Sequence, residues 1–105
     1  MTRITYQYSD DSFALDVSGH SGYAPAGDDI VCAGISALVQ TLAIRADEIG
    51  EDTMIDLPGG GEAHIRSSGD RILDFFEGIL EGLQAIAEAY PSNAEVTYTD
   101  IRKSC

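Results

Sequence analysis

The chain has 105 residues, of which 44% are hydrophobic, and its 18 acidic and six basic side chains give a formal net charge of -12. A chain of this length forms one domain and can bury roughly 65% of the surface of its unfolded state. The negative charge disfavours direct binding to a nucleic-acid backbone and suits a basic partner, although high acidity also serves solubility. We therefore expect a single domain over residues 1–105 that binds no nucleic acid directly.

The N-terminal segment Met1–Tyr6 has no apolar core of signal-peptide length, and we expect no run of about 18 apolar residues that could span a bilayer. A cytoplasmic protein without membrane contact is the resulting expectation. Its two cysteines, Cys32 and Cys105, should then stay reduced. Cys105 is the last residue, and we interpret it as an incidental exposed thiol.

A β-hairpin is predicted at the start of the chain, followed by a loop. Apolar residues alternate with polar ones on both sides of a turn at Asp10-Asp11, namely Ile4, Tyr6 and Tyr8, then Phe13, Leu15 and Val17. Residues 20–28 contain glycine, proline and small residues without an apolar period, so they are expected to form a loop.

A helix is predicted from Ile30 to about Gly50. Apolar residues recur there at three- and four-residue spacing, as Val31, Ile35, Leu38, Leu42, Ala46 and Ile49. Asp28 or Asp29 can cap this helix, which places Cys32 in its first turn. The positive end of the helix dipole favours a thiolate there.

The helix terminus alone does not activate the Cys32 thiol. It stabilises a nearby anion by about 0.3 to 1 kcal/mol, whereas one pKa unit corresponds to about 1.4 kcal/mol. The neighbouring carboxylates Asp28 and Asp29 also oppose ionisation, so a nearby protonated His20 is needed to hold the anion. Cys32 and His20 are therefore candidates for a nucleophile and its base, although from the spacing alone a small core cysteine and an inert loop histidine are the more common case.

The second half of the chain is predicted to add two strands, a helix and a last strand. Thr53–Leu57 and Glu62–Ser67 flank a turn at Pro58–Gly61, a helix opens at Asp70 and is stopped by Pro91, and Val96 and Tyr98 belong to the final strand. The order ββαββαβ predicts an α+β domain in which two helices cover a mixed sheet.

Two segments resemble the signature of a known family. GHSGYA at residues 19–24 and GDDIVCAGISAL at residues 27–38 closely resemble that of the ribosomal-processing cysteine proteases, often called Prp. The resemblance implies a cysteine endopeptidase in which His20 and Cys32 are the catalytic pair. It further implies a homodimer that uses no cofactor or metal and removes the N-terminal extension of the precursor of large-subunit ribosomal protein twenty-seven, cutting after a phenylalanine.

Four further residues are candidates for supporting roles. Gly19 and Gly22 belong to a loop whose glycines could let it move as substrate enters. Asp29 is expected to cap the helix, or in a weaker interpretation to orient His20. Ser36 lies on the same helix face as Cys32, where it could pack on the sheet, form a floor for the peptide or meet a second subunit.

Other interpretations remain open. Zinc binding by His20, Cys32, His64 and Cys105 has enough ligands, but the spacing lacks a close pair of cysteines or histidines. His64 alternates with its neighbours in a predicted strand and is expected to face solvent or a neighbouring side chain. A non-catalytic ribosome-associated binding module and a thiol-based regulatory protein are the alternatives to a protease.

Overall fold

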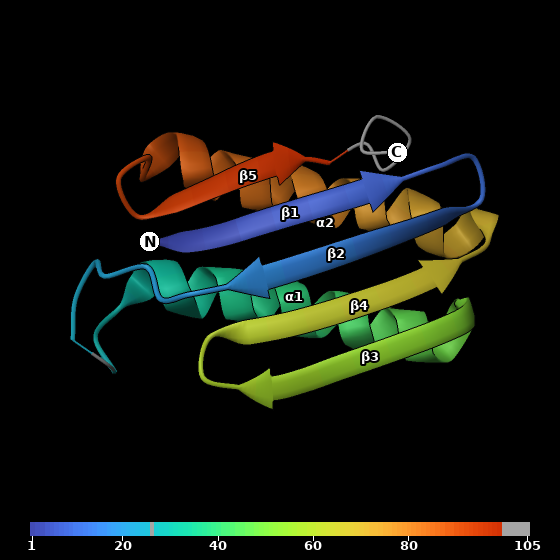
Figure 1. The fold of residues 1–105 in the computed structure, drawn as a ribbon, viewed down its shortest axis with the longest axis horizontal. Helices are drawn as coiled ribbons and strands as arrows, with labels where there is room; N and C mark the ends of the chain where they lie inside the picture. The colour runs from blue at the N-terminus through green and yellow to red at the C-terminus, as the bar shows by residue number, and fades with distance from the viewer. Residues whose placement is uncertain (26, 100–105) are drawn as a thin grey trace.

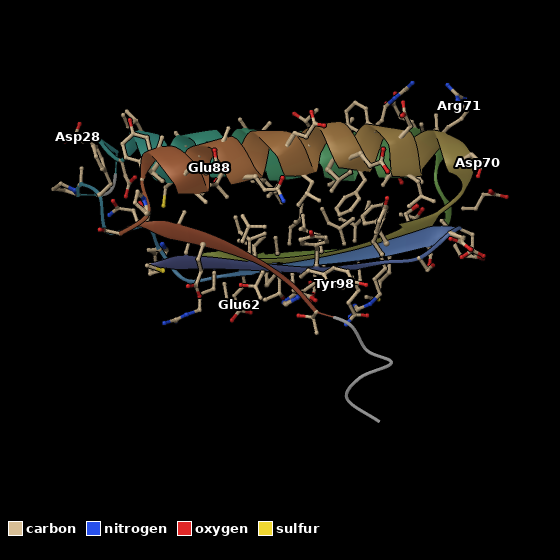
Figure 2. All side chains as sticks on the ribbon, turned by 90° about the horizontal axis from the view of Figure 1, so that it is seen from above. Asp28, Glu62, Asp70, Arg71, Glu88 and Tyr98 are labelled. Carbon is tan, nitrogen blue, oxygen red and sulfur yellow. The ribbon has the colours of Figure 1, made fainter. Side chains whose placement is uncertain are left out.

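The computed structural model describes residues 1–25 and 27–99, so Cys105 lies outside the described residues. Within these residues the chain forms β1 (Thr2–Tyr8), β2 (Ser12–Ser18), α1 (Ile30–Ile49), β3 (Glu51–Gly59), β4 (Glu62–Ser68), α2 (Asp70–Ala89) and β5 (Ala94–Tyr98). Both helices lie on the same face of one sheet (Figures 1 and 2). The predicted α+β fold, with its ββαββαβ order and mixed sheet, is confirmed.

The order of strands in the sheet decides what surrounds the loop after β2. The five strands run β3-β4-β2-β1-β5; β5 is parallel to β1 and the other neighbours are antiparallel. β2 is therefore central, and its C-terminal end lies between the start of β1 and the start of β4 (Figure 1). The loop that carries His20 leaves the sheet at this point.

The hydrophobic core lies between the sheet and the helices. Alternation along β2 turns Phe13, Leu15 and Val17 towards the helices, and all three are buried. The ring of Phe13 stacks on that of Phe76 in α2, with centroids 4.3 Å apart and planes inclined by 8°. This packing holds the two layers together, because each fully buried aromatic side chain stabilises the fold by about 1.5–3 kcal/mol.

The edge strand β3 is longer than the sequence predicts. It runs from Glu51 to Gly59 and includes Pro58, whereas the apolar alternation covers only Thr53–Leu57. An edge strand tolerates proline, since one side of its backbone needs no partner. Its register with β4 shifts between Asp56 and Gly59, next to the turn that leads into β4.

One expectation about membranes needs correction. By length and composition α1 could cross a membrane, so the chain does contain a run that approaches the required length. Its buried residues are Val31, Ile35, Val39, Leu42, Ala43 and Ala46, which belong to the same core as the sheet and α2. This packing is that of a core helix in a two-layer domain.

Candidate active site

The first turn of α1 is capped as the sequence predicts. Asp29 is the N-cap, and its Oδ1 accepts a hydrogen bond from the backbone N–H of Cys32 at 2.9 Å. Cys32 is therefore the third residue of the helix. The thiol is half-buried and is held at the end of the helix where the backbone dipole favours negative charge.

The loop that carries His20 is packed between the starts of β1 and β4. Gly19 has a φ of +90°, and a Cβ at this position would lie 2.5 Å from the carbonyl oxygen of Met1. On the other side, a Cβ at Gly61 would lie 2.7 Å from the carbonyl oxygen of Gly19 and 3.1 Å from Cε1 of His20. Both positions therefore need glycine for space, and the backbone before His20 is confined from two sides.

His20 and Cys32 line the same cavity. It has a volume of about 370 Å³ and lies between α1 and the ends of the central strands. Its walls include the apolar side chains of Val17, Ile35, Val39, Leu57 and Ala63, whereas Gly19, Ser36 and Glu62 add polar or small surface. The exposed His20 and the half-buried Cys32 thus meet a space that can hold part of a peptide.

Ser21 is one of three residues at this site that the sequence did not indicate as candidates. It is only 2% exposed, and its backbone N–H donates to Cys32 Sγ at 3.5 Å. Its hydroxyl donates to Asp29 Oδ2, and its carbonyl oxygen accepts from Asn93 Nδ2 at 3.0 Å. Ser21 therefore connects the histidine loop, the cap of α1 and the turn before β5.

Both oxygens of the Asp29 carboxylate are used by neighbours. The hydroxyl of Ser21 and then the backbone N–H of Cys32 hold the pKa of Asp29 below its ordinary value. The ionised carboxylate fixes the spacing between the Ser21 loop and the first turn of α1. These contacts support the capping role of Asp29 rather than an orientation of His20.

Gly22 and Ser36 occupy different surroundings. Gly22 has a φ of +69°, and a Cβ there would meet nothing within 4 Å, so its backbone conformation, not close packing, favours glycine. Ser36 is exposed and lines the cavity one turn after Cys32. Val39 and Ala43, which continue its face, are buried in the core, so the small-residue face both packs and borders the cavity.

A larger hollow of about 610 Å³ lies at the other end of β1 and β2, lined by residues such as Tyr8, Asp52 and Arg66. Among the described residues its lining contains neither a thiol nor an imidazole. Nucleophilic chemistry needs both groups beside one space, so we assign the site to the smaller cavity.

The second histidine belongs to a different part of the molecule. His64 pairs across β4 and β2 with Asp16, and its Nδ1 lies 2.7 Å from Asp16 Oδ1. Glu62 Oε2 is 3.7 Å from Nε2, and Asp56 is the register partner of His64 on β3. The prediction that His64 faces solvent or a neighbouring side chain is confirmed. Its alternation with Ala63 and Ile65 places it on the sheet face opposite the helices, so it does not join His20 and Cys32.

The Asp16–His64 pair predicts a pH dependence of stability. The hydrogen bond to Asp16 raises the pKa of His64 above its ordinary value of 6.5, although burial opposes this shift. The raised pKa means that the contribution is complete below pH 6.5 and is lost as the pH rises through the folded-state value. Urea unfolding at about pH 5.5 and about pH 8.5 should therefore show a smaller loss of stability in Asp16→Asn than in the wild type. Equal losses in the two proteins would contradict this assignment, and Glu95→Gln on β5 is the control.

The sequence did not indicate three residues of this site, each for a different reason. Ser21 follows His20 directly, but a serine in a glycine loop carries no signal of burial. Gly61 belongs to a glycine run that is typical of any turn. Asn93 contacts a residue 72 positions away, and only the parallel pairing of β5 with β1 brings it there.

The family model and the relatives that match this chain carry the same description. A family model described as cysteine protease Prp matches residues 1–95. The chain is 27% identical over 111 residues to the ribosomal processing cysteine protease Prp of Bacillus subtilis, covering 92% of this chain and 96% of the relative. It is 30% identical over 110 residues to the protein of the same name from Staphylococcus aureus, covering 93% of this chain and 99% of the relative.

Solved structures show the same likeness. The S. aureus ribosomal processing protease Prp with a covalently linked product peptide superposes with a TM-score of 0.82 at 27% identity, covering 94% of this chain and 100% of that one. The S. aureus protease with a substrate peptide gives a TM-score of 0.74 at 28% identity, with the same coverage. SMU.848 from Streptococcus mutans, at 22% identity, 94% coverage of each chain and a TM-score of 0.72, shares the fold.

Proposed function

The chain belongs to the Prp family of ribosomal processing cysteine proteases, and we propose that it removes the N-terminal extension of large-subunit ribosomal protein twenty-seven with Cys32 as nucleophile and His20 as base. The observation that carries this proposal is the position of both side chains on one cavity at the start of α1. Gly19, Gly22, Asp29 and Ser36 support the pair by shaping its loop, its cap and its cavity wall.

The proposed mechanism passes through a thioester. Cys32 Sγ attacks the scissile carbonyl carbon while His20 takes the thiol proton. His20 then gives this proton to the leaving amine as the peptide bond breaks, and water releases the acid from the sulfur. In the S. aureus relative a product peptide is covalently linked, which supports covalent chemistry at a site of this fold.

The Asp29 cap reduces the number of backbone N–H groups that could donate to the developing oxyanion. The first turn of a helix offers backbone N–H groups, but that of Cys32 already donates to Asp29 and that of Ala33 to the Asp29 carbonyl. The backbone N–H of Ser21 donates to Cys32 Sγ, with the nitrogen 3.5 Å from the sulfur. It is therefore a candidate donor beside the N–H groups of Ile30 and Val31 at the start of α1, because an oxyanion formed at the sulfur-bound carbon arises next to it.

The proposed substrate suits the charge and lining of the chain. Ribosomal proteins are generally basic, and a net charge of -12 attracts such a partner over distance. The apolar wall formed by Val17, Ile35 and Leu57 can receive an aromatic side chain next to the cleaved bond. Cytoplasmic location and a homodimer complete the proposal; the side chain of Ile44, which is 63% exposed on α1, supplies apolar surface for a second subunit.

A peptide assay tests this function. A synthetic peptide that carries the basic N-terminus of the host ribosomal protein behind its extension, with phenylalanine at the junction, should be cut once, after that residue. Mass spectrometry of both fragments identifies the bond. A peptide with aspartate in place of the phenylalanine is the matched control and should be cut at least about tenfold more slowly, since the apolar wall gives a carboxylate no partner.

The same assay separates the alternatives. Binding without cleavage of the correct host-derived peptide would favour a non-catalytic ribosome-associated module. No binding and no cleavage, together with reversible oxidation of Cys32, would favour a thiol-based regulatory protein.

A further inference from the structure

Asn93 contacts the active-site loop from the far end of the chain. It lies in the turn between α2 and β5, and its side-chain Nδ2 donates to the carbonyl oxygen of Ser21 at 3.0 Å. Its own backbone is held at both ends, because its N–H donates to the carbonyl of Tyr90 and its carbonyl accepts from the N–H of Thr2, each at 2.9 Å. The amide group therefore projects from a fixed position.

Ser21 has a hydrogen bond at each of its polar groups. The carbonyl is held by Asn93, the hydroxyl by the Asp29 carboxylate, and the remaining N–H donates to Cys32 Sγ at 3.5 Å. With two groups anchored and the side chain buried, the direction of the N–H is determined by its neighbours rather than by the loop itself. Gly22, which follows Ser21 at a φ of +69°, has no side chain that could hold this part of the loop in place.

From this geometry we propose that Asn93 is a positioning residue, which holds the carbonyl of Ser21 so that the Ser21 N–H points at the Cys32 sulfur and stabilises its anionic form. A hydrogen bond to a charged acceptor is stronger than one to a neutral acceptor, so the N–H favours the thiolate over the thiol. Removal of the Asn93 amide frees one anchor of Ser21 and weakens this preference. The inference rests on the proposed role of Cys32 as nucleophile, but its test needs no substrate.

The test measures the alkylation of Cys32 by iodoacetamide as a function of pH. Cys105→Ser provides the parent protein, in which Cys32 is the single thiol. Asn93→Leu has a similar shape without a donor and without added charge. Ser92→Ala, an exposed neighbour in the same turn, is the matched control.

In Asn93→Leu the alkylation rate below the midpoint of the pH profile should fall about tenfold, while the rate at the alkaline plateau stays unchanged. Loss of structure would instead alter the plateau as well. Ser92→Ala should follow the parent profile. In the peptide assay the loss should appear in kcat more than in KM, because Asn93 lies behind Ser21 rather than on the cavity. A folded Asn93→Leu protein whose profile superimposes on that of the parent would overturn the proposal.

A second measurement tests the contact on which the proposal depends, even if Asn93→Leu fails to fold. To remove the response of the Ser21 amide to its neighbour His20, the parent also carries His20→Ala; the amide proton of Ser21 should then shift in the NMR spectrum as Cys32 ionises, and this titration should vanish when Cys32→Ala is added. An amide that does not respond would refute the contact between the Ser21 N–H and the thiolate. A shifted alkylation profile without any peptide cleavage would refute the proposed protease substrate and leave the role of Asn93 intact.

Discussion

Cys32→Ala should lower kcat for peptide cleavage by at least about three orders of magnitude, and His20→Ala should have an effect of similar size. The first variant removes the proposed nucleophile, and the second removes the group that takes and returns its proton. The double variant should be little worse than either single one, since both residues act in one step. The measurement is kcat/KM on the extension peptide, with purified variants compared in parallel.

Two controls accompany this prediction: peptide binding by Cys32→Ala, and the activity of a variant at the histidine outside the site. Cys32→Ala should still bind the peptide, because the cavity walls that hold it come from other residues, and added salt should weaken this binding if charge steers the encounter. His64→Ala should keep its activity, since His64 pairs with Asp16 on the sheet face opposite the helices. Robust cutting by Cys32→Ala, with contaminating proteases excluded, would refute the mechanism.

Gly61→Ala should reduce activity strongly although residue 61 carries no chemical group. A Cβ at this position would lie 2.7 Å from the carbonyl oxygen of Gly19 and 3.1 Å from Cε1 of His20, so the loop has to move. A displacement of the base by about 1 Å can cost about a hundredfold in rate. We expect a fall in kcat of about ten- to hundredfold, measured with the same peptide.

Gly60→Ala is the matched control, because it isolates the cost of backbone conformation. Gly60 and Gly61 have φ values of +65° and +84°, so alanine is strained at both positions, but a Cβ at Gly60 meets nothing within 4 Å. Both variants should lose about 1–2 kcal/mol of stability from the left-handed backbone. Of the two variants, only Gly61→Ala should also lose peptide-cleaving activity in the folded protein. Equal activities in the two folded variants would show that the His20 loop does not depend on the turn before β4.

Much of this protein follows from its sequence, because the deciding interactions are local. Alternation of apolar and polar residues places Phe13, Leu15 and Val17 on one face of β2. In α1, apolar residues at three- and four-residue spacing give the helix one buried side. The cap on Cys32 is likewise a contact between neighbours, as Asp29 lies three residues before it. The order of elements is therefore recognisable without coordinates, whereas His20 and Cys32 are identified as a catalytic pair through the resemblance of residues 19–24 and 27–38 to the Prp signature.

The surroundings of that pair depend on contacts between distant segments, which only the tertiary structure decides. The strand order β3-β4-β2-β1-β5 brings the start of β4 against the Gly19 carbonyl, and the parallel pairing of β5 with β1 brings Asn93 to Ser21 across 72 residues. Periodicity and turn residues describe each segment separately, whereas strand order results from burying all the apolar faces together. For this reason the two catalytic candidates could be named from the sequence, but the residues that hold them in place could not.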